Sequence, residues 1–245
     1  MAQSPQANPG MSLGALAKAD ELRNRLLFTL GALIVYRLGT FIPLPGIDPV
    51  ALSDVFGQQS SGILGMFDMF SGGALGRMTI FALNIMPYIT ASIIMQLMTA
   101  IVPSLETMKK DGEAGRKQIN QYTRYLTVLL ATFQGFGIAV ALESAGNIVA
   151  DPGMFFRLTT VVTLVGGTLF LMWLGEQITS RGIGNGISLI IFSGIVAEVP
   201  SALIGTLELG RTGALSAGLI VGVFVMAIAV IAFIVFIERS VRRIL

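Results

Sequence analysis

The sequence has no cysteine and no histidine among its 245 residues, and charged residues make up only 12% of it. Without thiols or imidazoles, the chain cannot form disulfides, cysteine–histidine zinc sites, thiol nucleophiles or serine–histidine pairs. The net charge of +2 does not suggest nucleic-acid binding, and we expect none. Hydrophobic residues, by contrast, make up 53% of the chain, and the mean hydropathy is +0.78. This composition is typical of an all-α integral membrane protein.

Long apolar runs predict six transmembrane helices, because about 20 helical residues cross the hydrocarbon core. Residues 1–21 are polar and lack the basic start and short apolar core of a secretory signal, so we expect a disordered tail. The predicted spans are residues 22–42, 78–102, 125–142 and 158–175, a fifth between Arg181 and Glu198, and a sixth between Arg211 and Glu238.

Basic residues are distributed unequally over the loops between these spans. If the spans alternate in direction, the loops on one side carry 12 of the 16 lysines and arginines. The other side keeps only Arg37, Arg77, Arg157 and Arg211. Cytoplasmic loops of membrane proteins are rich in Lys and Arg, so the N-terminus is predicted to be cytoplasmic.

One apolar segment is too short to be a span. Residues 63, 66, 67 and 70 are apolar and share one helical face, and Gly72-Gly73 ends the pattern. A helix of about a dozen residues cannot cross a bilayer. The segment is therefore either an amphipathic helix at the interface or a re-entrant helix folded back into the protein.

No predicted span carries a charged residue near its middle. Such a charge costs at least about 2.5–3.5 kcal/mol and would indicate an ion path or a proton relay. A serine–lysine pair within the membrane is also excluded, because every lysine lies outside the spans. We therefore expect no enzyme, no catalytic residue, no metal site and no cofactor.

Three local patterns allow more than one interpretation. The glycines of residues 182–186 (GIGNG) resemble a dinucleotide-binding loop, but without a βαβ unit they predict a tight turn. Pro87 is predicted to kink the second span. Polar residues within the spans indicate either hydrogen bonds between helices or a polar seam between helices that can separate. They are Asn84, Thr90, Ser92, Gln96, Thr99 and Gln134.

Longer motifs resemble those of one known family. They are residues 36–48 (YRLGTFIPLPGID), 69–75 (MFSGGAL), 84–89 (NIMPYI), 121–125 (QYTRY) and 173–188 (WLGEQITSRGIGNGIS). Together they resemble SecY, the channel-forming subunit of the bacterial Sec protein translocase, from about residue 22 to residue 245. Because that family has ten spans in two inverted halves, the resemblance implies an N-terminal fragment containing the first six spans. Residues 22–200 would form the N-terminal half with spans one to five. Residues 201–245 would form an outer loop and the sixth span, the start of the C-terminal half.

The resemblance also assigns roles to residues whose spacing alone indicates ordinary packing. It implies a re-entrant plug at about residues 60–76, which closes the channel from outside. The plug residues are Ile63, Leu64, Met66, Phe67, Met69, Phe70, Ser71, Gly72 and Gly73. It implies a ring of aliphatic side chains at the pore, made by Ile85, Ile89, Ile187 and Ile191. Thr90 and Gln134 would belong to a polar cluster at the lateral gate.

The implied function is a passive conduit for unfolded secretory proteins that also releases transmembrane segments sideways into lipid. The implied partners are the SecE and SecG subunits, the SecA motor, the ribosome and precursor proteins. The implied location is the bacterial cytoplasmic (inner) membrane. Two alternatives remain open from the residues: a small-solute secondary transporter with broken helices and a structural scaffold for membrane complexes.

Overall fold

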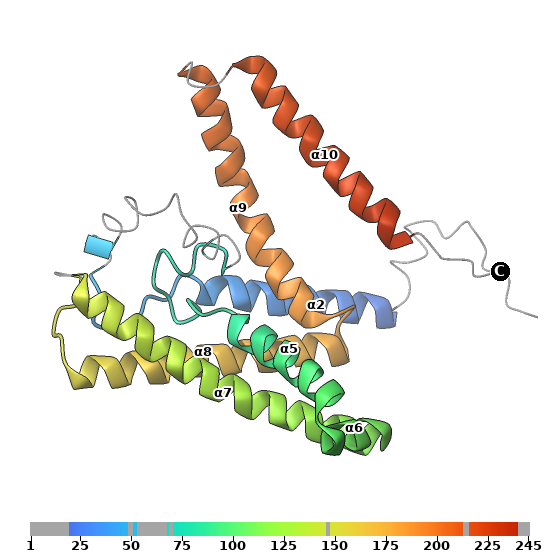
Figure 1. Cartoon of the computed structure of the whole chain (residues 1–245). Coiled ribbons are helices and arrows are strands. Elements are labelled where there is room, and N and C mark those ends of the chain that lie inside the picture. Colours follow the sequence, from blue (N-terminus) through green and yellow to red (C-terminus); the bar gives the residue numbers. More distant parts are fainter. Residues whose placement is uncertain are drawn as a thin grey trace, which may run out of the picture. The chain divides into compact units, whose positions relative to one another are not determined.

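A computed structural model describes residues 20–48, 51–52, 68, 71–145, 148–212 and 216–239 of the chain. Within these residues the secondary structure is helical, and β pairing is limited to two isolated bridges. The helices are α2 (Asp20–Gly39), α5 (Met86–Ile101), α6 (Pro103–Lys110), α7 (Glu113–Ser144), α8 (Met154–Arg181), α9 (Gly186–Arg211) and α10 (Ala217–Arg239). The predicted all-α architecture is confirmed (Figure 1).

Four of the described helices are long and apolar enough to cross a membrane, namely α7, α8, α9 and α10. The bent pair of α5 and α6 is a fifth candidate if the two helices count as one span. Six spans were expected. The first of them, at residues 22–42, corresponds to α2, which is not among these candidate helices. It carries Arg23 and Arg25 near its start and Arg37 near its end, so its crossing stays a prediction.

The second predicted span was wrong in extent. Residues 78–85 form turns, and α5 begins only at Met86, so Pro87 stands in the first turn instead of kinking a longer helix. Proline suits that position because its fixed φ fits a helix and its missing N–H has no intrahelical partner there. The helix ends before Pro103, which starts α6 at an angle of 99° to α5.

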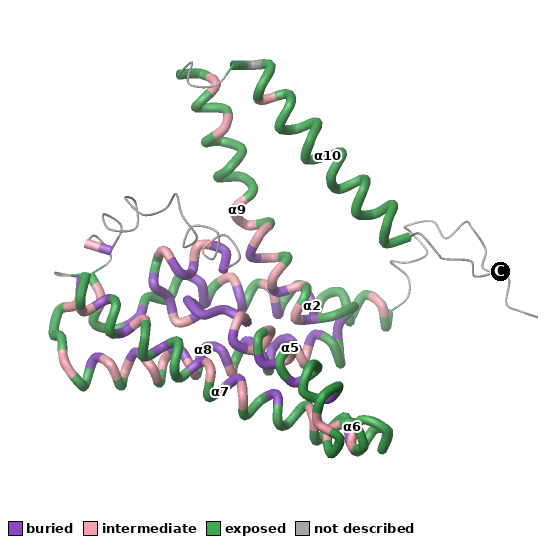
Figure 2. The backbone as a smooth tube through the Cα atoms, in the orientation of Figure 1, coloured by how far each residue is buried: buried purple, intermediate pink, exposed green. Residues whose placement is uncertain are grey.

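The chain divides into two compact units, Met1–Val196 and Ala197–Leu245, at a boundary within α9. In the first unit α7 packs against α8, α5 packs against α7, and α2 packs against α8. Figure 2 shows buried positions along these helices and in the turns that precede α5. In the second unit the described side chains of α10 are exposed, except for the half-buried Ile220, and almost entirely apolar, as in a helix that faces lipid.

Small residues bring α7 and α8 together. Buried positions recur every four residues along α7, at Thr123, Thr127, Ala131, Gly135 and Ala139. A side-chain carbon placed on Gly135 would lie 3.6–3.7 Å from α8, in ordinary van der Waals contact. Small residues allow backbones to approach closely, which stabilises helix pairs in lipid.

Three loops join at the end of this unit where α7 leads into α8. The backbone N–H of Leu44 donates to Met78 (2.9 Å), and that of Ile80 donates to Ile42 (3.0 Å). The N–H of Asp48 donates to Ile148 (2.8 Å). These bonds satisfy irregular backbone and fix residues 78–80 beside the end of α2.

Candidate functional site

The turns formed by residues 78–85 pass between α2 and α8, and two glycines make room for them. A side-chain carbon on Gly39 of α2 would overlap the ring of Phe81. One on Gly167 of α8 would overlap the carbonyl oxygen of Ile80. Both positions therefore require glycine for a close approach, and the turns are wedged between α2 and α8.

Stacked aromatic rings connect these turns to α2 and α8. The ring of Phe81 stacks on Tyr36 of α2, with centroids 6.2 Å apart, and on Phe170 of α8, at 5.8 Å. Phe170 in turn lies against Trp173, again at 5.8 Å. Because aromatic pairs add about 0.5–1.5 kcal/mol beyond their buried area, this stack stabilises the position of residues 78–85.

Two arginines hold the chain where it enters the turns. The Arg37 guanidinium donates to the carbonyl oxygen of Gly72 (2.9 Å), and Arg77 donates to the same oxygen (3.1 Å) and to that of Gly73 (2.9 Å). Both guanidinium groups also lie over the ring of Phe41, 5.1 and 4.6 Å from its centroid. The sequence predicts both arginines on the same side of the membrane. In the structure they contact the same two residues, Gly72 and Phe41.

The segment predicted as a plug is covered by the structure only at its end. Ser71, Gly72 and Gly73 are described, and the Ser71 hydroxyl accepts from the N–H of Leu75 (3.1 Å). The Asp68 carboxylate accepts from the N–H of Gly76 (2.7 Å). Ile63, Leu64, Met66, Phe67, Met69 and Phe70 lie outside the described residues. Their role stays a prediction.

Directly after the turns lies an apolar cluster. It is formed by residues from distant parts of the sequence. Ile85 is one of its buried members, and Ile89 and Ile187 are half-buried and pack against the cluster. Its other buried aliphatic members are Ala32, Leu171, Leu174, Ile178 and Ile190. Three of the four predicted ring residues therefore meet. Ile191 is half-buried on α9 and is not a member of this cluster.

The turn between α8 and α9 fixes the position of Ile187, which α9 contributes to the cluster. The Asn185 side chain accepts from the N–H groups of Ile187 (3.0 Å) and Ser188 (3.3 Å), which caps α9. The Thr179 hydroxyl accepts from the N–H of Gly186 (2.9 Å), and Thr29 of α2 accepts from the N–H of Ile183 (3.2 Å). The glycine motif is thus a fixed turn, as predicted, and it ties the start of α9 to α8 and α2.

The predicted gate residues lie on two packed helices. Thr90 on α5 and Gln134 on α7 are both exposed, and the Thr90 hydroxyl donates to the carbonyl oxygen of Met86 (3.0 Å). This bond within one helix satisfies the hydroxyl in an apolar environment. Among the described residues, no hydrogen bond joins Thr90 to Gln134, so their joint role stays a prediction.

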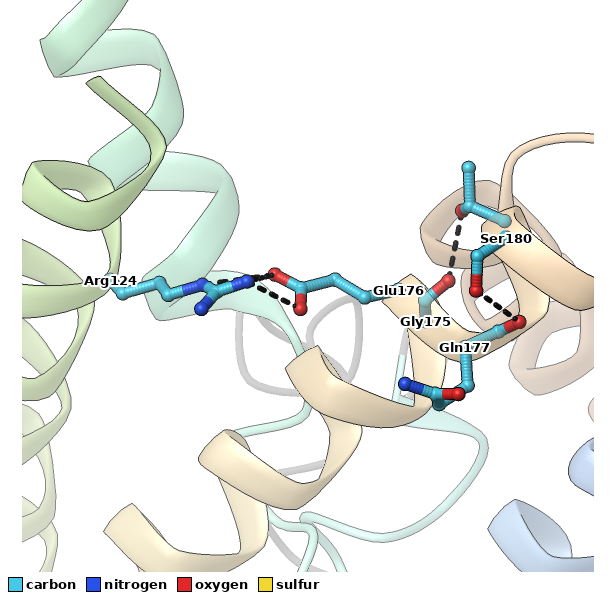
Figure 3. Close-up of polar contacts among 6 residues, drawn as sticks. Arg124, Gly175, Glu176, Gln177 and Ser180 are labelled. Carbon is cyan, nitrogen blue, oxygen red and sulfur yellow. Dashed lines mark hydrogen bonds and ion pairs between the residues drawn. The ribbon is translucent and has the colours of Figure 1, made fainter. Parts of the chain in front are cut away.

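An ion pair between α7 and α8 was missed by the sequence reasoning (Figure 3). The Arg124 guanidinium donates to both carboxylate oxygens of Glu176, at 2.7 and 2.6 Å. In the sequence, Arg124 occurs only as part of the motif at residues 121–125. The partners are 52 residues apart, so no local spacing could have linked them. The pair is part-exposed, and it joins two helices that small residues already hold together.

The described residues offer no group of three acidic side chains that could hold a metal ion. The features that do converge are an apolar cluster, a wedge of turns and a fixed α8–α9 turn.

Comparisons with known proteins agree on one family. A family model for SecY matches residues 79–245. The protein translocase subunit SecY of Rickettsia conorii is 58% identical over 230 residues, covering 92% of this chain and 53% of the relative. The SecY subunit of Buchnera aphidicola subsp. Acyrthosiphon kondoi is 55% identical over 247 aligned positions, covering 100% of this chain and 68% of the relative. The chain spans about half the length of the first of these relatives.

A solved structure has the same fold at low sequence identity. It is Sec61 in the canine ribosome-channel complex from the endoplasmic reticulum, which is 21% identical with a TM-score of 0.58. The match covers 91% of this chain and 49% of the Sec61 chain.

Proposed function

Because the chain belongs to the SecY family, we propose that it forms part of a protein-conducting channel in the bacterial cytoplasmic membrane. The channel passes unfolded secretory proteins and releases apolar segments sideways into lipid. In this proposal residues 22–200 are the N-terminal half of the channel, with the tail at residues 1–21 in the cytoplasm. Residues 201–245 begin the C-terminal half. The chain acts as a conduit and not as an enzyme.

One observation carries the proposal: Ile187 of α9 packs in the same apolar cluster as Ile85 and Ile89 at the start of α5, although it lies far from them in the sequence. In a pore, a narrow neck of aliphatic side chains excludes ions by dewetting. It also yields to a passing polypeptide, because it offers neither hydrogen bonds nor charges that would bind particular sequences. Ile191 completes this ring from the next turn of α9.

The remaining predicted residues take their places around this neck. The plug, of which Ser71, Gly72 and Gly73 are described, closes the channel from outside. Thr90 on α5 and Gln134 on α7 belong to the lateral gate, where a signal sequence leaves for the lipid according to its apolar length. The solute-transporter alternative finds no support in the family.

The partners follow from the same family membership. We infer that SecE and SecG complete the membrane complex, and that SecA or a translating ribosome delivers the precursor from the cytoplasmic side. The canine relative was solved as part of a ribosome–channel complex, which supports partners of this kind in general. No nucleic-acid binding by this chain itself is part of the proposal.

The test uses the intact protein in proteoliposomes, with its copurifying subunits. Serine is placed at Ile85, Ile89, Ile187 and Ile191, and at Ile101 as the control, since Ile101 is 75% exposed at the end of α5. We expect the four ring variants to raise the resting ion conductance and to accept weaker signal sequences, while Ile101→Ser changes neither. Unchanged conductance and unchanged signal selectivity in the ring variants would show that the ring assignment is wrong. A parental protein that transports no precursor would refute the channel itself.

A further inference from the structure

The buried positions of α9 lie along a single face of the helix. They are Gly186, Ile190 and Gly194, each four residues after the last. A side-chain carbon on Gly186 would overlap the carbonyl oxygen of Gly175 in α8, and Ile190 is a buried member of the apolar cluster. The third position, Gly194, is contacted by Gly72, which lies far from it in the sequence.

Gly72 and Gly194 bring two backbones into direct contact. A side-chain carbon on Gly72 would lie 3.0 Å from the Cα atom of Gly194 and 3.2 Å from its carbonyl oxygen. Both distances are shorter than ordinary van der Waals contact. Gly72 is also buried, and its φ of +66° is one that glycine adopts without strain. Glycine at this position therefore allows the chain to lie directly against α9.

Arg37 of α2 holds Gly72 from the other side. Its guanidinium donates to the carbonyl oxygen of Gly72 at 2.9 Å, although the two residues are 35 positions apart. Arg77 donates to the same oxygen, but it follows Gly72 by only five residues and so bonds within its own segment. Of these two donors, Arg37 is the one that joins Gly72 to a helix. A hydrogen bond from a charged donor is about twice as strong as one between neutral groups.

We propose that Arg37 is a positioning residue for the channel neck: by holding Gly72 against Gly194, it keeps α9 seated so that Ile187 and Ile190 stay in the apolar cluster. The inference rests on the proposed function. The fixed α8–α9 turn supports the start of α9, and the contact with Gly72 supports it beyond the cluster. Among the described residues, the helix pairs that pack extensively do not include α9, so its position depends on these supports.

Two variants disturb this contact from opposite sides. Arg37→Met removes the donors and the charge at similar side-chain length, and Arg37→Lys keeps the charge and a donor. Gly72→Ala places a carbon against the backbone of α9, which can yield only if the helix moves. Its matched control is Gly112→Ala, because Gly112 has a φ of +74° and nothing within 4 Å of the added carbon. Both alanines carry the same left-handed strain, and only one meets α9. Arg23→Met is the control for losing an arginine of α2, since Arg23 is exposed.

The experiment measures resting ion conductance per channel in proteoliposomes of the intact protein with its copurifying subunits, and thermal unfolding in parallel. We expect Arg37→Met to raise conductance at least about fivefold, the effect of losing one charged hydrogen bond on an open–closed equilibrium. Arg37→Lys should leak less, and Arg23→Met should match the parent. Gly72→Ala should leak at least about fivefold more than Gly112→Ala. Combining Arg37→Met with Gly72→Ala should stay within about twofold of the larger single effect, because both release the same contact.

Four results would overturn the proposal. Parental conductance in Arg37→Met would show that the guanidinium positions nothing. Equal conductance in Gly72→Ala and Gly112→Ala would show that the approach to α9 is irrelevant to the neck. A double variant whose effect is the product of the single effects would mean that the two residues act separately. A lowered unfolding temperature with parental conductance would indicate a role in folding only.

Ile187→Ser, measured in the same series, separates this inference from the proposed function. If Ile187→Ser leaks while Arg37→Met and Gly72→Ala do not, only the positioning role of Arg37 fails. If none of the three leaks, the proposed neck is refuted as well.

Discussion

The wedge between α2 and α8 makes a sharp prediction about two adjacent glycines, Gly166 and Gly167. A methyl group at Gly167 would overlap the carbonyl oxygen of Ile80, whereas one at Gly166 meets nothing within 4 Å. The overlapped atom belongs to the backbone of residues 78–85, which α2 confines on the other side. It cannot move aside as a flexible side chain could.

The expected loss of unfolding free energy follows from comparing two variants, Gly166→Ala and Gly167→Ala. Both replace glycine in the middle of α8 and gain the same helix propensity, about 1 kcal/mol, so this term cancels in the difference. What remains is the overlap at Gly167. Overpacking of a close-packed interior typically costs about 1–3 kcal/mol. Gly167→Ala should therefore be less stable than Gly166→Ala by about that amount.

The assay is thermal unfolding of the intact protein in detergent, followed by tryptophan fluorescence. Trp173 is the single tryptophan of this sequence and lies against Phe170, next to the wedge. At about 2–4 °C per kcal/mol for a chain of this size, the two variants should differ by several degrees. Equal unfolding temperatures would refute the wedge, because they would mean that Ile80 does not pass close to Gly167.

Two smaller effects follow from the polar contacts. Asn185→Ala removes the cap of α9 and should cost about 1 kcal/mol in unfolding free energy, whereas Asn185→Asp keeps an acceptor and should cost much less. Equal losses in both would contradict the capping role. Glu176→Gln breaks the pair with Arg124 and should cost about 0.2–1 kcal/mol, because the pair is part-exposed. High salt should reduce that difference, and a salt-independent loss would assign the effect to packing.

The sequence predicted the long helices well, because hydropathy measures what lipid requires. The runs at 125–142 and 158–175 lie within α7 and α8, which both extend beyond them. Apolarity marks only the part of a helix within the hydrocarbon, so the polar start of α7 at Glu113 was missed. The fifth helix passes Glu198 and Pro200 and ends at Arg211 for the same reason.

The turns of residues 78–85 could not be predicted from hydropathy. They are as apolar as a span, yet they are buried between α2 and α8 and pair their backbone with neighbouring loops. Non-helical backbone is tolerated at membrane depth when protein surrounds it. The available signal was Pro87, which favours a helix start as well as a kink.

The candidate site was predictable only in part. The resemblance to SecY selected Ile85, Ile89 and Ile187, which the structure brings together, although their spacing alone indicates ordinary packing. Tyr36 stands out in the sequence only as part of the motif at residues 36–48, because its stacking on Phe81 is a contact that only folding creates. The pair of Arg124 and Glu176 was missed because it also depends on tertiary packing.

The central claim is that a translocating polypeptide passes the neck formed by Ile85, Ile89 and Ile187. Because this sequence contains no cysteine, single cysteines can be introduced at these positions and, as the control, at the exposed Ile101. A precursor with one cysteine is arrested during transport by the intact protein, and disulfide formation is then measured. The account predicts crosslinks at the three neck positions and none at Ile101. Crosslinks at Ile101 as strong as those at the neck, or none at the neck, would contradict it.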